Sequence, residues 1–426
     1  MRSLSAFVFA TIGVALVWAL SAIVPFIVLA MPGLEGLITP SPREVALLAC
    51  CYGAGAVFWL FLSTEMAALI SRRSMVGWTA LQTAGLLIAL PLLGNSLPMM
   101  MILMAGLGCM NAVVWAVWFP LLLEVDYRMR PSMAAAFFVA LYSAAAIGIP
   151  GAVELTTFLG PLRALLAFGG MSMIAALLVI GASKSILRPS RVTAPTSFFR
   201  FGKAELSRLF NLSFIFLCLI ILPTFTWVLQ ALEQGVLSIG LAEKFRIDQS
   251  GLLWIAGIAR APALAVLLLT MPTIRHGVPL RYFGLGLLIS GGALPVLVNT
   301  ANSFVFTGAY MVCFAGVGLC WGAFFAAISA AVPRETRFAA LLVAALALVT
   351  GALAASGWQW VADFLDLETE FVFATTAIGV SGVGLTGLLA SFFASLNGVN
   401  QGGHSEEDHQ TSQTNFRKFT YGNPQS

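Results

Sequence analysis

Apolar residues run along this chain in long stretches that short polar segments separate. A helix needs about 20 apolar residues to cross the hydrocarbon core of a bilayer, and twelve stretches reach or approach that length. Because lipid cannot hydrogen-bond open backbone groups, we predict that each stretch is a membrane-spanning helix. The predicted spans are residues 6–31, 45–70, 75–93, 98–123, 133–154, 163–182, 210–232, 251–273, 282–299, 303–331, 338–361 and 370–396.

The second half of the chain repeats the first at an offset of roughly 205–210 residues. Ala105–Gly108, in the fourth stretch, corresponds to Ala315–Gly318 in the tenth. Arg128 and Arg334 also correspond, and each is followed by an alanine-rich apolar run. Two like halves of six spans are typical of secondary transporters, whose substrate binds between the halves near the middle of the bilayer.

The composition excludes a soluble globular protein. Hydrophobic residues make up 59% of the 426 residues and charged residues only 9%, whereas a soluble domain has about 25% charged residues. The first apolar run is too long for the apolar region of a cleaved signal peptide, so we interpret it as the first span. All six cysteines lie inside predicted spans and the three histidines have no metal-ligand spacing. We therefore expect no metal site and no cofactor.

Positive charge predicts the orientation in the membrane. With the N-terminus in the cytoplasm, 17 of the 22 Lys and Arg residues lie in cytoplasmic segments and four on the other side, while Arg260 lies inside a span. This is a strong positive-inside bias. We expect a multi-pass protein of the bacterial inner (plasma) membrane with both termini in the cytoplasm. The net charge of +4 reflects this bias in the loops, and we expect no nucleic-acid partner.

The polar segments suggest four parts. Residues 183–209 carry six basic residues and one acid, and we interpret them as a cytoplasmic linker that lies against anionic lipid headgroups. Residues 397–426 are polar and lack apolar periodicity, so we expect a disordered cytoplasmic tail. The predicted division is an N-terminal six-helix half (1–182), the linker (183–209), a C-terminal six-helix half (210–396) and the tail (397–426).

With twelve spans, a six-plus-six repeat and a basic central linker, the chain resembles the major facilitator superfamily over about residues 5–396. That family usually has a Gly-x-Leu-x-Asp-Arg-x-Gly-Arg-Arg-like loop between spans two and three. Leu69 and Arg72 match this pattern, while Ser71 replaces the acid and Ser74 the glycine. The resemblance implies an all-α membrane protein with two pseudo-symmetric six-helix halves. Glu65, in span two, could substitute for the missing acid.

Span five contains Gly148-Ile149-Pro150-Gly151. This segment is similar to the Gly-Pro motif of the drug/proton antiporters in that superfamily. Pro and Gly in a membrane helix also simply permit a bend, and we favour the bend.

Arg260 is the sharpest candidate for transport chemistry. It lies about ten residues into span eight, too deep to reach either surface, and an arginine at that depth costs about 2.5–3.5 kcal/mol on insertion scales. A buried acid, carbonyl groups, a water-filled cavity or an anionic ligand must offset this cost. Because the guanidinium fork binds both oxygens of a carboxylate or phosphate, we predict a substrate contact. The alternative is a structural ion pair.

Several acids are candidates for coupling or gating. Glu65 lies inside span two, where a carboxylate is suited to proton uptake and release. Alternatively, it pairs with Arg72, Arg128 or Arg130 near the cytoplasmic end. Three further acids, at the extracytoplasmic ends of spans five, seven and eleven, are either solvated or form a gate with Arg163, Lys244 or Arg246. These acids are Glu154, Glu233 and Asp363.

The resemblance implies that spans one, four, seven and ten line a central cavity. The polar and tryptophan residues of these spans are then candidates for substrate binding, although tryptophan also packs helices and marks membrane interfaces. The candidates are Trp18, Ser21, Asn111, Trp115, Thr224, Thr226, Trp227, Gln230 and Trp321.

The function that these features favour is secondary active transport of a small organic solute, anionic or zwitterionic, by alternating access with ion or proton coupling. One alternative is a proton-coupled exporter of apolar or cationic compounds. Another is a non-transporting assembly or scaffold protein on the same fold. The sequence has no P-loop, HExxH or GxSxG pattern, so we do not expect an enzyme. The expected partners are the solute, a coupling ion such as the proton and membrane lipids, and we expect a monomer.

Overall fold

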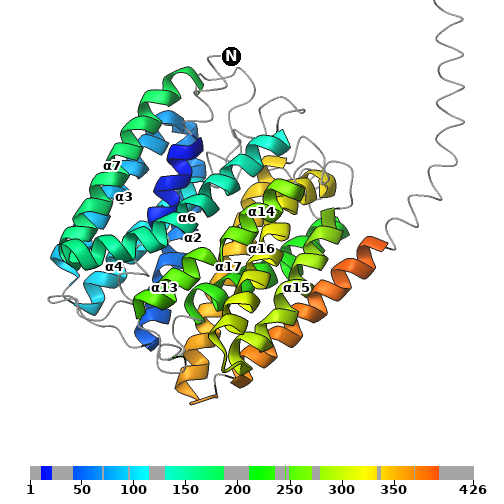
Figure 1. Cartoon of the computed structure of the whole chain (residues 1–426). Coiled ribbons are helices and arrows are strands. Elements are labelled where there is room, and N and C mark those ends of the chain that lie inside the picture. The colour runs from blue at the N-terminus through cyan, green and yellow to red at the C-terminus, as the bar shows by residue number, and fades with distance from the viewer. Residues whose placement is uncertain are drawn as a thin grey trace, which may run out of the picture.

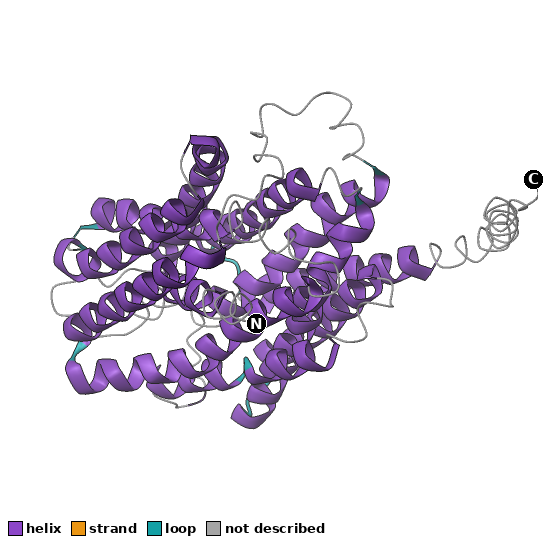
Figure 2. Cartoon of the chain, turned by 90° about the horizontal axis from the view of Figure 1, so that it is seen from above, coloured by secondary structure: helices purple, strands orange, loops and turns teal. Residues whose placement is uncertain are grey.

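The computed structural model is helical throughout the part of the chain that it describes, with no strand there (Figure 2). The described residues are 11–21, 42–69, 72–94, 96–114, 130–186, 211–235, 245, 249–270, 279–332, 337–368 and 370–392. Ten of the described helices are long and apolar enough to cross a membrane. Two shorter apolar helices, Thr11–Ser21 and Leu97–Cys109, coincide with the first and fourth predicted spans.

The first half contains the Thr11–Ser21 helix and five longer helices. These are α2 (Pro42–Leu69), α3 (Arg72–Leu93), α4 (Leu97–Val113), α6 (Arg130–Leu159) and α7 (Pro161–Ile186). They match predicted spans two to six, and the fold class is confirmed. The boundaries of the linker and the tail stay predictions, because residues 187–210 and 393–426 lie outside the described ranges.

In the second half, two predicted spans are subdivided. Span seven consists of α9 (Leu212–Phe216), the π-helical turn η3 (Leu217–Ile221), α10 (Leu222–Gln230) and a second π-helical turn, η4 (Ala231–Gly235). Span eight consists of α13 (Gln249–Ile258) and α14 (Ala261–Thr270). The last four spans are α15 (Pro279–Asn299), α16 (Ser303–Ala331), α17 (Arg337–Phe364) and the Glu370–Phe392 helix.

The break in span eight has a local cause. Pro262 has no backbone N–H, so it cannot donate to the carbonyl of Ile258, and its ring crowds the preceding turn. The chain tightens there, and the N–H of Arg260 donates to the carbonyl of Gly257, three residues back, at 3.1 Å. The bond from the Leu264 N–H to the Arg260 carbonyl is long, at 3.4 Å. The predicted span is therefore interrupted at Arg260, the residue that the sequence singles out.

Helix packing repeats between the two halves. In α4, a Cβ at Gly106 would meet the Leu86 side chain of α3, and one at Gly108 would meet the Tyr52 carbonyl of α2. In α16, the equivalent Gly316 and Gly318 lie against α15 and α14 in the same way. Spans four and ten thus occupy equivalent positions, and small residues let the backbones approach closely. The repeat in the sequence therefore reflects a repeat in packing.

Removing this close approach should lower stability. We expect Gly108→Ala to destabilise the protein by about 1–3 kcal/mol, the usual range for overpacking, because its methyl group would overlap the Tyr52 carbonyl. Gly170→Ala in α7 is the matched control, since a Cβ there meets nothing within 4 Å. Thermal unfolding of the purified variants measures the difference. Equal melting temperatures for the two variants would contradict this packing.

Among the described residues, the two halves meet mainly along two seams, one on α6 and one on α2. In Figure 1 the first-half helices α3 and α7 lie to one side and α15, α16 and α17 to the other, with α6 and α13 near the boundary. α6 packs against α13 and α14, and α2 packs against α17. Close contact at both seams depends on glycine. A Cβ at Gly257 of α13 would lie 2.5 Å from Pro150 Cδ of α6, and one at Gly53 of α2 would lie 2.8 Å from Leu353 Cδ2 of α17.

α6 is one continuous helix from Arg130 to Leu159 although it contains Pro150. Gly148 and Gly151 flank this proline and face open space. The proline ring therefore forms part of the contact with Gly257.

One face of the bundle is called the predicted outer face, because the charge bias predicts that it faces away from the cytoplasm. At this face α6, η4 and α17 end, and α13 and α16 begin.

Candidate functional site

Arg260 lies between the two halves of span eight, and its side chain is only 6% exposed. Its Nη1 donates to the Ala256 carbonyl at 2.6 Å, and its Nη2 lies 3.4 Å from Oε1 of Glu233. The guanidinium carbon also lies 4.7 Å from the centroid of the Phe314 ring. A carbonyl, an acid and an aromatic face thus offset the desolvation of this charge.

Glu233 comes from η4, at the end of span seven on the predicted outer face. Its side chain remains 43% exposed, unlike that of Arg260. A charge-assisted hydrogen bond usually measures about 2.7–2.9 Å, so the 3.4 Å contact between these two side chains is a loose one. The pair therefore has one buried partner and one accessible partner, and a competing anion could displace the acid.

Two tyrosines, neither of which stood out in the sequence, complete the surroundings of this pair. The Tyr310 hydroxyl of α16 donates to the Leu232 carbonyl at 2.8 Å and lies close enough to Arg260 and Glu233 to interact with both charges. The Tyr142 hydroxyl of α6 lies within electrostatic range of the same two residues. Tyr142 belongs to the first half, so both halves contribute polar groups here.

Below this pair, away from the predicted outer face, an aromatic cluster joins the two halves. Trp18 stacks on Phe137 with ring centroids 5.3 Å apart, and Phe138 stacks on Trp321 at 4.5 Å. Phe225 of α10 meets Trp321 edge to face at 4.9 Å. Trp18 and Trp321, both predicted to line the cavity, thus come together through two phenylalanines of α6. The cluster fills the interface between the halves at this depth.

The hydroxyl groups that the sequence predicts as substrate contacts donate hydrogen bonds to backbone carbonyls of their own helices. Ser21 donates to the Trp18 carbonyl at 2.8 Å and Thr224 to the Ile220 carbonyl at 2.7 Å. Thr226 donates to the carbonyls of Leu222 and Pro223 at 3.2 and 3.1 Å. These side chains lie in the predicted spans, but in this arrangement their protons are directed to the backbone.

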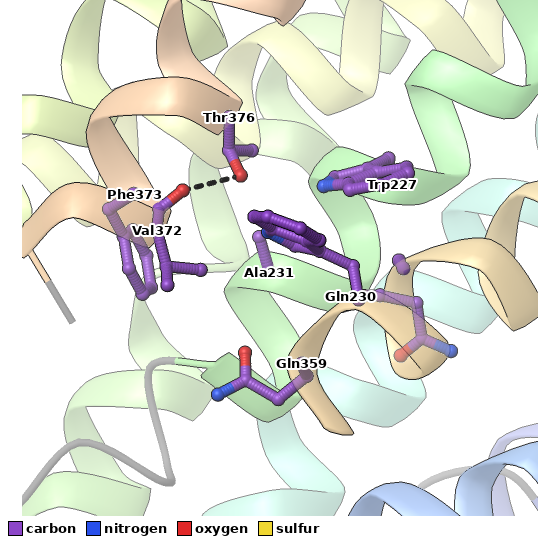
Figure 3. Close-up of a pocket in the computed structure, with 9 residues that line it drawn as sticks. Trp227, Gln230, Ala231, Gln359, Val372, Phe373 and Thr376 are labelled. Atoms are coloured by element: carbon purple, nitrogen blue, oxygen red, sulfur yellow. Dashed lines mark hydrogen bonds between the residues drawn. The ribbon is translucent and has the colours of Figure 1, made fainter. Parts of the chain in front are cut away.

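Trp227 and Gln230, also predicted as substrate contacts, line a separate pocket within the second half (Figure 3). It lies between α10–η4, α17 and the Glu370–Phe392 helix, has a void of only about 20 Å³, and is partly open to its surroundings. Trp358 lines it as well. Span seven thus faces two different environments.

Glu154 contacts the opposite half, but not through an ion pair. The Trp254 indole N–H of α13 donates to Oε1 of Glu154 at 3.1 Å, and both side chains are exposed. Of the cationic partners that the sequence suggested for this acid, Lys244 and Arg246 lie outside the described residues. This contact lies about one turn from the contact between Pro150 and Gly257, on the same faces of α6 and α13.

The remaining candidates are placed only in part. Glu65, Arg72, Asn111 and Asp363 lie in α2, α3, α4 and α17, but their side chains lie outside what the structure describes. Trp115 and Arg128 lie outside the described residues altogether.

No family model matches this sequence, and no curated protein does. Solved structures do match. A crystal structure of a mutant of the peptide transporter POT in complex with alafosfalin superposes with a TM-score of 0.64 at 13% identity, covering 91% of this chain and 93% of the other. A POT family transporter in complex with a thioalcohol-conjugated peptide gives a TM-score of 0.63 at 13% identity, with coverage of 91% and 96%.

Both neighbours are described as transporters. At this level of identity the likeness concerns the fold. Together with the ten apolar helices and the repeated packing of the two halves, it shows that the chain is an integral multi-pass membrane protein with the major facilitator fold.

Proposed function

We propose that this protein is a proton-coupled secondary transporter that moves a small organic solute bearing a carboxylate by alternating access. The observation that carries the proposal is the buried Arg260 beside a partly exposed Glu233, at a depth where Tyr142 of the other half also reaches. The peptide transporter among the structural neighbours gives independent support, since a peptide carries a carboxylate.

The chemistry of the pair suggests how a proton and a solute are coupled. Glu233 and a substrate carboxylate compete for the same guanidinium. A proton on Glu233 removes its charge and weakens its hold on Arg260, which leaves the guanidinium fork free for the substrate. Loss of that proton restores the competitor and favours release of the solute. Uptake of a proton and binding of an anion then favour each other, as linkage requires.

The contacts between the halves suggest how access alternates. The seam of α6 against α13 closes the predicted outer face through Pro150–Gly257 and Glu154–Trp254. The aromatic cluster fills the interface on the other side of Arg260. Rocking of one half on the other would separate these two closures in turn around the fixed site.

A direct test uses the purified protein in liposomes with an inward proton gradient. Anionic, zwitterionic, cationic and neutral solutes are screened first by thermal stabilisation, because a ligand that binds only the folded state raises apparent stability. Those that stabilise the protein are then measured for uptake. We expect a carboxylate solute to accumulate only with the gradient. Accumulation of apolar or cationic solutes would favour the exporter, and no flux of any solute would favour a scaffold.

Glu233→Gln separates coupling from binding. The amide mimics the protonated acid, so we expect the variant to bind the carboxylate solute with an affinity that no longer depends on the proton concentration. Uptake driven by a proton gradient should fall at least tenfold, while exchange of internal for external solute continues. Retention of gradient-driven uptake by this variant would exclude Glu233 as the proton site. Glu370→Gln, at the exposed start of the last helix, is the matched control.

A further inference from the structure

The last turn of span seven carries Glu233, and a side chain from another span holds that turn. η4 ends at Gly235, and the last four carbonyls of a helix have no partner within the helix itself. One of them is the carbonyl of Leu232, the residue before Glu233. It accepts a hydrogen bond from the Tyr310 hydroxyl of α16 at 2.8 Å, and this bond is buried. The backbone that bears Glu233 is therefore attached to α16.

Tyr310 has little freedom to move. Its side chain is buried, and its ring lies between those of Phe306 and Phe314, with centroids 5.7 and 5.1 Å away. Phe314 is also the ring beneath the Arg260 guanidinium. Because these three aromatic residues are spaced four positions apart on α16, they lie along one face of that helix. One helix thus supports both members of the pair, Arg260 through Phe314 and Glu233 through Tyr310.

The opposite end of span seven is attached to α16 as well. The Asn211 side chain accepts from the Phe214 N–H at the start of α9 and donates to the Ala331 carbonyl at the end of α16. This second attachment does not involve Tyr310. Loss of the Tyr310 hydroxyl should therefore release only the end of span seven that carries Glu233.

We propose that Tyr310 is a positioning residue of the Arg260–Glu233 pair, because its hydroxyl holds the last turn of span seven where the carboxylate meets the guanidinium. The 3.4 Å contact between the two side chains is loose, and Glu233 is partly exposed, so the backbone of η4 decides how close they come. Turns of the π-helical kind often occur at functional sites. The effect on solute binding, but not the positioning itself, rests on the proposed function.

Hydrogen–deuterium exchange tests the positioning without any solute. Full-length wild type in nanodiscs is compared with Tyr310→Phe, which keeps the ring and removes only the hydroxyl. We expect the backbone amides of η4 to exchange about fivefold faster, the effect of one lost hydrogen bond, while those of α9 exchange as before. Tyr282→Phe, which removes a half-buried hydroxyl at the start of α15, is the matched control. Equal exchange of η4 in wild type and Tyr310→Phe would overturn the proposal.

The carboxylate solute then shows whether Tyr310 acts through Glu233. At alkaline pH, where a carboxylic acid is charged, we expect Tyr310→Phe to bind the solute about fivefold more tightly than the wild type, because the competing acid is held less well. In the Glu233→Gln background the same substitution should change nothing.

An equal change in both backgrounds would mean that Tyr310 acts on Arg260 or on the solute directly, and the positioning role would be wrong. A wild type that binds no carboxylate solute would contradict the proposed function. The exchange measurement would still decide whether Tyr310 holds the turn, since it needs no solute. The two failures are therefore distinguishable.

Discussion

Arg260→Gln should strongly weaken binding of the carboxylate solute and, with it, gradient-driven uptake. A hydrogen bond to a charged group contributes about 1.5–3 kcal/mol, so we expect the solute to bind about 10–100-fold more weakly. The remaining Ala256, Phe314 and Tyr310 contacts cannot replace the charge of the guanidinium. Arg260→Lys keeps the charge but loses the fork, and should give an intermediate affinity. Isothermal titration and proteoliposome uptake measure the two effects.

A folding defect must be separated from loss of binding. Arg260→Gln leaves Glu233 without its cation, although that acid is 43% exposed and can remain hydrated. The double variant Arg260→Gln/Glu233→Gln removes both charges, so we expect it to unfold near the wild-type temperature and still fail to bind. If the single variant is folded and binds the solute as the wild type does, Arg260 is a structural ion-pair residue and the anion hypothesis is wrong.

Cross-linking the two introduced thiols of the double variant Glu154→Cys/Trp254→Cys should stop transport completely. The two side chains meet across the seam between the halves, with 3.1 Å between the indole nitrogen and the carboxylate oxygen. A short bifunctional thiosulfonate reagent would hold α6 and α13 together at the predicted outer face, and alternating access requires this end to open. We expect uptake to fall to background after cross-linking and to return after reduction. Each single cysteine variant, treated with the same reagent, is the control.

Transport by the cross-linked protein at the rate of its reduced form would mean that this seam does not open. The native cysteines do not complicate the design in the second half, where Cys218, Cys313 and Cys320 are buried. Cys50 and Cys51 of α2 are partly accessible, so the experiment uses a background in which both are alanine. Loss of uptake in that background before cross-linking would require another pair of positions.

The sequence identified the central residue of the candidate site but not its environment. Arg260 could be selected because a charge inside a long apolar run is costly wherever the helix packs. Glu233 could be named only as an acid at the end of a span, since it lies 27 positions before Arg260 in the chain and nothing in the sequence indicates that the two side chains meet. Tyr310, Tyr142 and Phe314 gave no signal, because aromatic residues are common in membrane helices. Their role near Arg260 follows from packing alone.

Several expectations depended on which way a helix faces, and these could not be settled from the pattern. Trp227 and Thr226 are neighbours in sequence, yet one lines the pocket of Figure 3 and the other donates to its own backbone near Gly351. In a soluble protein, the apolar stripe would have shown the buried face of each helix.

By itself, the sequence determined the number of spans, the two-fold repeat and the depth of Arg260, because crossing a bilayer constrains length and polarity so strictly. It did not determine which surfaces face protein and which face lipid. The windows Glu44–Leu62 and Ser303–Ile328 have the same mean hydropathy, 2.1, yet 33% of the first and 72% of the second is buried inside the protein. Lipid and protein interior are alike apolar, so only the close packing of small residues such as Gly108 and Gly257 decided which helices meet, and hence which side chains surround Arg260.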